Sequence, residues 1–144
     1  MWGISNEEFN VPKKVKLLNF GTPSYCINKV NISEDSELEC LRFTGNNYNR
    51  IIEKIYIPEN LSEISLSSIK ILDFEVHPEN TNFRLIEDYL IDSEGHPLWI
   101  RPGITETVIP KEVTSLTLRN ENITSIEFED NSQLDSLSIY DSKV

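Results

Sequence analysis

The chain has 144 residues, of which 38% are hydrophobic and 26% charged, a composition typical of a globular domain rather than a disordered segment. Its formal net charge of −11 disfavours binding to nucleic acid or an anionic membrane, because their phosphates require clustered lysine and arginine. No apolar run approaches the ~20 residues that span a bilayer. We therefore expect neither membrane insertion nor a nucleic-acid partner.

A short apolar unit recurs along the chain, with the pattern apolar, two residues, apolar, one residue, apolar. In a strand, the last two apolar side chains of the unit point to the same face, so Leu116 and Leu118 should both point inward. A helix would need apolar residues at i, i+3, i+4 and i+7, and that pattern is not sustained. In chain order, the copies are Val15-Leu18-Phe20, Ile27-Val30-Ile32, Leu38-Leu41-Phe43, Ile52-Ile55-Ile57, Leu61-Ile64-Leu66, Ile71-Phe74-Val76, the weaker Ile104-Thr107-Ile109, Val113-Leu116-Leu118, Ile123-Ile126-Phe128 and Leu134-Leu137-Ile139.

These units are themselves part of a longer repeat. Pro110 follows Pro58 by 52 residues, Phe128 follows Val76 by 52 residues, and the apolar positions between them match without an insertion. Two units make one coil of roughly 20 to 23 residues, and stacked coils bury the apolar side that one coil cannot bury alone. The sequence therefore predicts a β-rich solenoid, a right-handed coil of short strands forming a single domain over residues 1–144. The repeats occupy residues 10–76 and 104–139.

Residues 77–103 interrupt the repeats. Two β-rich runs, at residues 86–92 and 98–103, flank a short loop that contains glycine. This arrangement predicts an inserted β-hairpin that projects from one side of the solenoid.

The aromatic residues of the insertion lie where the regular core pattern is broken. Exposed aromatic and arginine side chains mark protein interfaces, so Tyr89, Trp99 and Arg101 are candidate partner-binding residues. The alternative is that these residues pack the hairpin onto the adjacent coil. We expect packing for Phe83 and keep both interpretations for the other three.

The segment Ile52–Ile64 resembles the signature L-x-x-I-x-I-P-x-x-V-x-x-I of BspA-type leucine-rich repeats, which occur in surface proteins of gut and oral bacteria and of some protists. The resemblance covers about residues 11–139, and related repeat proteins carry a similar inserted hairpin. The chain departs from the family pattern at residues 67–70 and 119–122, so we expect a shorter coil on that side. The resemblance implies a leucine-rich-repeat fold, protein binding or adhesion, and a cell-surface or secreted location.

The N-terminus shows neither the basic segment nor the apolar segment of a signal peptide. The protein is therefore expected to be intracellular, to have lost a leader, or to be a fragment of a longer chain.

The sequence offers no catalytic motif. His77 and His96 are the only histidines, and both precede a proline in expected turns. No phosphate-binding loop, zinc-ligand pair or activated-nucleophile motif occurs. We therefore expect no enzymatic activity, no cofactor and no metal site.

Two features allow two interpretations each. Cys26 and Cys40 could pair across neighbouring coils, which would indicate an oxidising compartment, although two half-buried thiols that never meet are favoured. An expected acidic strip could bind calcium, but a solvated edge that discourages strand aggregation is favoured. The strip comprises Glu34, Asp35, Glu37, Glu39, Glu129, Asp130 and Asp135.

The repeats leave small, polar or acidic side chains facing outward, which suits a broad recognition surface. We therefore predict a non-enzymatic module for protein binding or adhesion. The alternative is a self-assembling module that forms homo-oligomers through an open final coil at Leu137 and Ile139. At the other end, Trp2, Ile4 and Phe9 are candidates to cap the core. The outward-facing residues are Glu63, Ser65, Ser115, Thr117, Glu127, Ser136 and Ser138.

Overall fold

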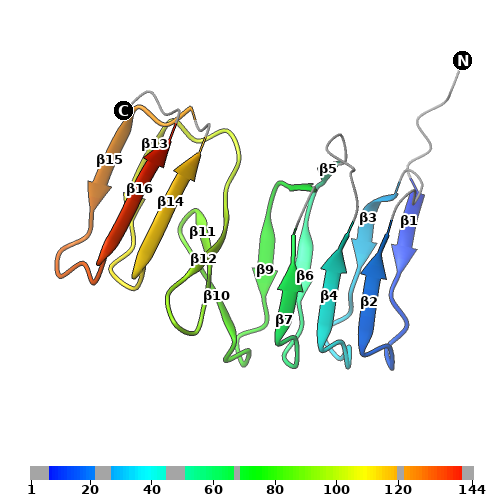
Figure 1. The fold of residues 1–144 in the computed structure, drawn as a ribbon. Coiled ribbons are helices and arrows are strands. Elements are labelled where there is room, and N and C mark those ends of the chain that lie inside the picture. The colour runs from blue at the N-terminus through cyan, green and yellow to red at the C-terminus, as the bar shows by residue number, and fades with distance from the viewer. Residues whose placement is uncertain (1–6, 22–26, 45–50, 67–68, 120–121, 141–144) are drawn as a thin grey trace, which may run out of the picture. The chain divides into compact units, whose positions relative to one another are not determined.

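The computed structural model describes residues 7–21, 27–44, 51–66, 69–119 and 122–140, and these residues form strands but no helix (Figure 1). Consequently, nothing in these ranges is a helix long and apolar enough to cross a membrane. The strands are β1 (Glu7–Asn10), β2 (Leu17–Phe20), β3 (Ile27–Asn31), β4 (Cys40–Phe43), β5 (Ile51–Ile52), β6 (Ile55–Ile57), β7 (Glu63–Ser65), β8 (Lys70–Ile71), β9 (Phe74–Val76), β10 (Phe83–Ile86), β11 (Tyr89–Asp92), β12 (Pro97–Ile100), β13 (Glu106–Ile109), β14 (Ser115–Arg119), β15 (Ser125–Phe128) and β16 (Ser136–Tyr140).

The chain divides into two compact units, residues 1–82 and 83–144. The boundary lies inside the predicted insertion, between β9 and β10. Each unit has the architecture of a β-solenoid. That the two form a single domain stays a prediction.

The first unit is built from parallel strands that pair with strands one coil further along the chain. On one side, β1 pairs with β3, β5 with β8, and β6 with β9. On the other side, β2, β4 and β7 form a three-stranded sheet in that order. All of these pairs are parallel, as stacked coils require.

The coil length can be read from the pairing register. Leu18 lies opposite Leu41, which lies opposite Ile64, so these two coils are 23 residues long. Ile55 lies opposite Phe74, only 19 residues later. The shorter coil contains the segment around residues 67–70 that departs from the family pattern, and the shortening expected there is confirmed.

The inward positions of the short units form the core of the first unit. Leu41, Ile55, Ile57 and Leu61 have no exposed surface. Aromatic rings continue the core across the first coils, because Phe9 meets Phe20 edge-on at 5.6 Å and Phe20 stacks on Phe43 at 5.1 Å between centroids. The predicted capping role of Trp2 and Ile4 falls on residues outside the described ranges.

Ion pairs join neighbouring coils on the surface of the first unit. Lys13 Nζ lies 2.7 Å from Asp35 Oδ2, and Lys16 Nζ lies 2.8 Å from Glu39 Oε1. Hydrogen bonding and attraction to Asp35 raise the pKa of Lys13, and the same contact lowers the pKa of Asp35. Because water screens exposed pairs strongly, these contacts favour the register of the coils more than they add stability.

The second unit combines an antiparallel sheet with two parallel pairs. Strands β10, β11 and β12 form the antiparallel sheet in that order, while β13 pairs with β15 and β14 with β16. The predicted hairpin is therefore present as β11 and β12, and β10 adds a third strand on its other side. A single core joins this sheet to the coil, because Tyr89 and Ile91 of β11 pack with Ile109, Val113 and Leu118.

The 52-residue repeat appears in the backbone hydrogen bonds of both units. In the first unit, the Ile57 carbonyl accepts a hydrogen bond from His77 N–H at 2.9 Å. In the second, the Ile109 carbonyl accepts one from Glu129 N–H at 3.1 Å, with both partners displaced by 52 residues. The repeat found in the sequence is thus a repeat of one coil geometry.

The last coil leaves its apolar residues exposed. Leu116 and Leu118 of β14 are buried as predicted, with 3% and 0% exposed surface. Their register partners in β16, Leu137 and Ile139, are 38% and 41% exposed because no described coil covers them.

Candidate functional site

The insertion sheet places the candidate partner-binding residues on opposite faces. In the register of β11 and β12, Tyr89 lies opposite Ile100 and Leu90 lies opposite Trp99. Successive strand residues point to opposite faces, so Tyr89 and Trp99 do not share a surface.

Tyr89 belongs to the core. Its side chain has no exposed surface, and its hydroxyl lies 2.6 Å from the hydroxyl of buried Thr107 on β13. Tyr89 therefore follows the packing interpretation and cannot touch a partner in this conformation. Phe83 is buried as well, as expected.

Trp99 and Arg101 lie together and are partly exposed. The guanidinium carbon of Arg101 is 5.4 Å from the centroid of the Trp99 ring, within the range of a cation–π contact. Arg101 Nε also donates a hydrogen bond to Asp88 Oδ1 at 2.9 Å, in an ion pair whose side chains are about one-third exposed. Both contacts restrict the Arg101 side chain, so the pair presents a preformed surface.

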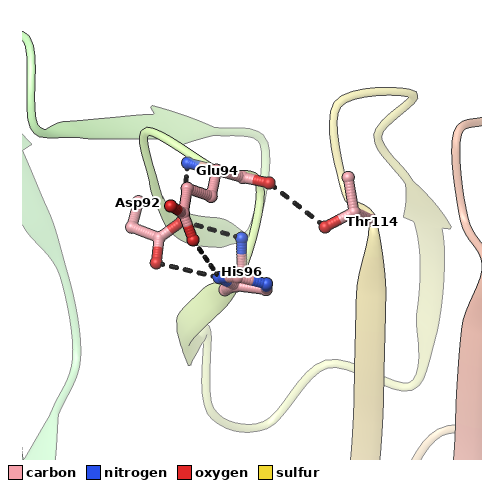
Figure 2. Close-up of polar contacts among 4 residues, drawn as sticks. All are labelled: Asp92, Glu94, His96 and Thr114. Atoms are coloured by element: carbon pink, nitrogen blue, oxygen red, sulfur yellow. Dashed lines mark hydrogen bonds and ion pairs between the residues drawn. The ribbon is translucent and has the colours of Figure 1, made fainter.

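The loop between β11 and β12 is closed by Asp92 (Figure 2). Asp92 Oδ1 accepts hydrogen bonds from the backbone N–H groups of Glu94 and His96, each at 2.9 Å. His96 Nδ1 lies 3.2 Å from Asp92 Oδ2 and 3.5 Å from Glu94 Oε2. The partly buried carboxylate thus organises the whole loop.

Two hydrogen bonds fasten this loop to the coil at Thr114. Its hydroxyl donates to the Glu94 carbonyl at 3.2 Å, as Figure 2 shows. Its backbone N–H donates to the Gly95 carbonyl at 3.1 Å. Gly95 has a φ of +84°, and a Cβ atom there would lie 2.2 Å from the Glu112 carbonyl oxygen. Only glycine fits both the conformation and the close approach.

Two hollows open on the second unit. One, of about 510 Å³, is lined by carboxylates that include Glu87, Asp88 and Glu106. The other, of about 320 Å³, lies between β12 and β14 and is lined by Trp99 and Thr117 among others.

Leu98 is a lining residue that sequence reasoning missed. The register of β11 against β12 passes from Leu90–Trp99 to Ile91–Pro97, so Leu98 is the extra residue of a β-bulge. The bulge leaves it 37% exposed beside Trp99 in the smaller hollow. The sequence does carry a signal for this exposure. A half-buried edge strand should alternate apolar and polar residues, whereas Pro97 to Ile100 is an unbroken apolar run.

The remaining candidates take structural roles. His77 Nδ1 accepts a hydrogen bond from Glu79 N–H at 3.1 Å, which closes a turn. Cys40 is buried, while Cys26 lies outside the described residues, so the pairing of the two cysteines stays untested. Across the described ranges, no three His, Cys, Asp or Glu side chains are placed to hold a metal ion.

The comparisons with known proteins concern the fold. No protein-family model and no curated protein matches the sequence. The crystal structure of the pneumococcal vaccine antigen PcpA is similar with a TM-score of 0.64 and 17% identity, over 93% of this chain and 39% of that chain. A leucine-rich cell surface protein from Faecalibacterium prausnitzii A2-165 is similar with a TM-score of 0.51 and 15% identity, over 92% of this chain and 41% of that chain.

At such identities the likeness shows the fold alone. It confirms the predicted leucine-rich-repeat solenoid. The chain spans about two fifths of the length of either neighbour.

The first prediction concerns the buried hydroxyl pair. Tyr89→Phe should lower the free energy of unfolding by about 1–3 kcal/mol, because it removes a hydrogen-bond partner of the buried Thr107 hydroxyl. Thr107→Val should cost a similar amount. The double variant should lose less than the sum of the two, and urea unfolding of all four proteins measures the coupling. Fully additive losses would contradict a direct hydrogen bond.

A second prediction concerns the pH dependence of the Asp92 loop. Burial raises the pKa of the Asp92 carboxyl, but hydrogen bonds from the N–H groups of His96 and Glu94 and the contact with the His96 imidazole outweigh it, so the pKa lies below its ordinary value. In the unfolded chain the pKa of an aspartate is about 3.9. At pH values above it, the lowered pKa of Asp92 stabilises the folded protein, and this stabilisation is lost as the pH falls through the pKa of Asp92 in the folded state.

The wild type and Asp92→Asn should therefore differ less in their free energy of unfolding as the pH falls below about 4. Urea unfolding of both proteins at each pH measures this difference. Exposed Asp130→Asn serves as the control and should show a small gap at every pH. A gap for Asp92→Asn that stays constant from pH 7 to pH 3 would refute the role of the carboxylate charge.

Proposed function

We propose that the chain is a non-enzymatic protein-binding module that acts in adhesion at a cell surface. The observation that carries this proposal is the partly exposed Trp99 ring, which Arg101 holds in place beside exposed Leu98 on an edge strand. Tryptophan and arginine are the residues that contribute most to binding energy in protein interfaces. The fold likeness to a vaccine antigen and to a cell surface protein supports the surface location.

The polar chemistry of the insertion supports binding over catalysis. The side chains in polar contact with the His96 imidazole are the carboxylates of Asp92 and Glu94, which belong to the loop that His96 helps to close. A catalytic histidine needs a nucleophile or a substrate proton within hydrogen-bond reach. These contacts support a structural role for His96.

A third prediction tests the adhesion proposal. Fluorescently labelled protein should bind saturably to intact bacterial or epithelial cells in flow cytometry, and Trp99→Ala should weaken the binding at least tenfold. The matched control is Leu17→Ala in the first unit, where a 56% exposed side chain is also truncated, and binding should not change. Thermal unfolding of each variant separates lost contacts from lost stability.

The proposal fails if binding does not saturate, or if both variants bind as the wild type does. A loss of several kcal/mol of stability in Trp99→Ala would assign the ring to packing instead.

Self-assembly through the last coil is a second candidate function. Leu137 and Ile139 of β16 and Phe128 of β15 are about two-fifths to one-half exposed, although the repeat directs such positions inward. A second copy could bury them by stacking its own coil on this end.

A fourth prediction tests this assembly. If the last coil is an interface between copies, the protein should form dimers or larger species in light scattering over a range of concentrations. Leu137→Asn should then shift it to the monomer. A wild-type protein that is monomeric at every concentration would exclude this function.

A further inference from the structure

Strand β14 has one edge without a strand partner in the described part of the chain. In the first unit, the middle strand β4 pairs on both edges, with β2 and with β7. In the second unit, β14 pairs only with β16. An edge strand presents a row of backbone N–H and C=O groups that a further strand can satisfy.

The hollow of about 320 Å³ lies along this edge. Ser115 and Thr117 of β14 line one side, and Leu98 and Trp99 of β12 line the other. The two hydrogen bonds of Thr114 to the loop before β12 hold the strands together at one end. Beyond Thr114 the strands form no ladder, so a preformed notch opens between them. A preformed site lowers the entropy cost of binding.

The two walls of the notch differ in their ability to pair with a strand. The edge of β12 carries Pro97, which has no N–H to donate, and the bulge at Leu98 disrupts the register. Both features protect a sheet edge from strand addition. The described edge of β14 carries neither a proline nor a bulge.

We propose that this notch binds an extended peptide segment of the partner protein, which adds as a parallel or antiparallel strand to the free edge of β14. Strand addition supplies main-chain hydrogen bonds for affinity and side-chain pockets for specificity. The five residues of β14 offer about 17 Å of edge, enough for a segment of similar length. Trp99 and Leu98 favour apolar side chains at alternate positions, and small Ser115 and Thr117 leave room on the other wall.

Charge favours a basic end on this segment. Residues 83–144 contain 12 aspartates and glutamates against 5 lysines and arginines. At the fastened end of the notch, Glu94 has a side chain that is 77% exposed and lies within the loop that also carries Asp92. A lysine or arginine flanking the apolar residues of the peptide would meet this carboxylate. The inference rests on the proposed function as a protein-binding module and names its site and ligand class.

The test uses the full chain and acetylated, amidated hexapeptides of sequence Lys-X-Thr-X-Thr-Lys, where X is valine, isoleucine, leucine or phenylalanine. Binding is followed by calorimetry and by amide hydrogen exchange. At least one peptide should bind saturably and slow the exchange of amides in Ser115–Arg119. The same peptide with N-methylated alternate residues keeps its charge but loses backbone donors, so it should bind at least tenfold more weakly. Trp99→Ala should weaken binding at least fivefold, whereas Leu17→Ala should not.

Three outcomes would overturn the inference: no peptide binds, N-methylated peptides bind equally well, or protection appears outside β14. The fate of the adhesion proposal is decided separately by cell binding. If cell binding depends on Trp99 but the tightest peptide does not compete, the protein-binding function stands and strand addition to β14 fails. If cell binding is absent while peptide binding follows the expected pattern, the notch is real and the cell-surface role fails.

Discussion

Parallel hydrogen bonding between strands one coil apart is the constraint on which the rest of the structure depends. A single coil exposes its apolar side, and only pairing with the next coil both satisfies the backbone and buries that side. The effect is visible along one ladder, where Leu118 is fully buried and its partner Ile139 is 41% exposed. Any segment that leaves this ladder must find its hydrogen bonds elsewhere. The insertion does so by folding into its own antiparallel sheet of β10, β11 and β12.

The constraint explains why so much of the fold could be predicted from the sequence. Each coil must place apolar residues at the same points, so the pattern repeats. Its 52-residue copy brings equivalent backbone hydrogen bonds to Ile57 and Ile109. A shorter pair of similar segments, Glu-Asp-Ser-Glu-Leu at residues 34–38 and Asp-Asn-Ser-Gln-Leu at residues 130–134, also adopts a shared geometry. There, the hydroxyls of Ser36 and Ser132 accept hydrogen bonds from the N–H groups of Leu38 and Leu134, both at 3.3 Å. Such a pattern depends only on the spacing of residues along the chain, so it can be recognised in the sequence alone.

What could not be predicted depends on contacts between distant segments. Thr107 interrupts the apolar pattern and makes its unit a weak copy, yet it is buried because Tyr89 of the insertion meets its hydroxyl. The strand β10 carries no clear alternation, and pairing with β11 defines it. Glu87 turns between them with a φ of 51°, a conformation that its residue type does not suggest. The exposure of Trp99 and the bulge at Leu98 likewise follow from register, which one strand alone cannot reveal.

The proposed binding surface lies where the repeat is broken. Within the repeats, neighbouring coils pair with each other's strand edges and bury each other's inward side chains. Lysines and carboxylates of neighbouring coils also form ion pairs, as Lys16 and Glu39 do. Outward residues such as Ser65 and Ser136 are small and polar and offer little binding energy, and exposed apolar residues such as Leu17 of β2 lie outside the two hollows. Beside the insertion, β14 keeps one strand edge without a ladder partner among the described residues, and β12 directs Leu98 and Trp99 into the hollow alongside it. Interruption of the ladder therefore creates a combination that an unbroken solenoid lacks, because backbone groups of β14, unpaired within the described ranges, lie next to the Trp99 ring.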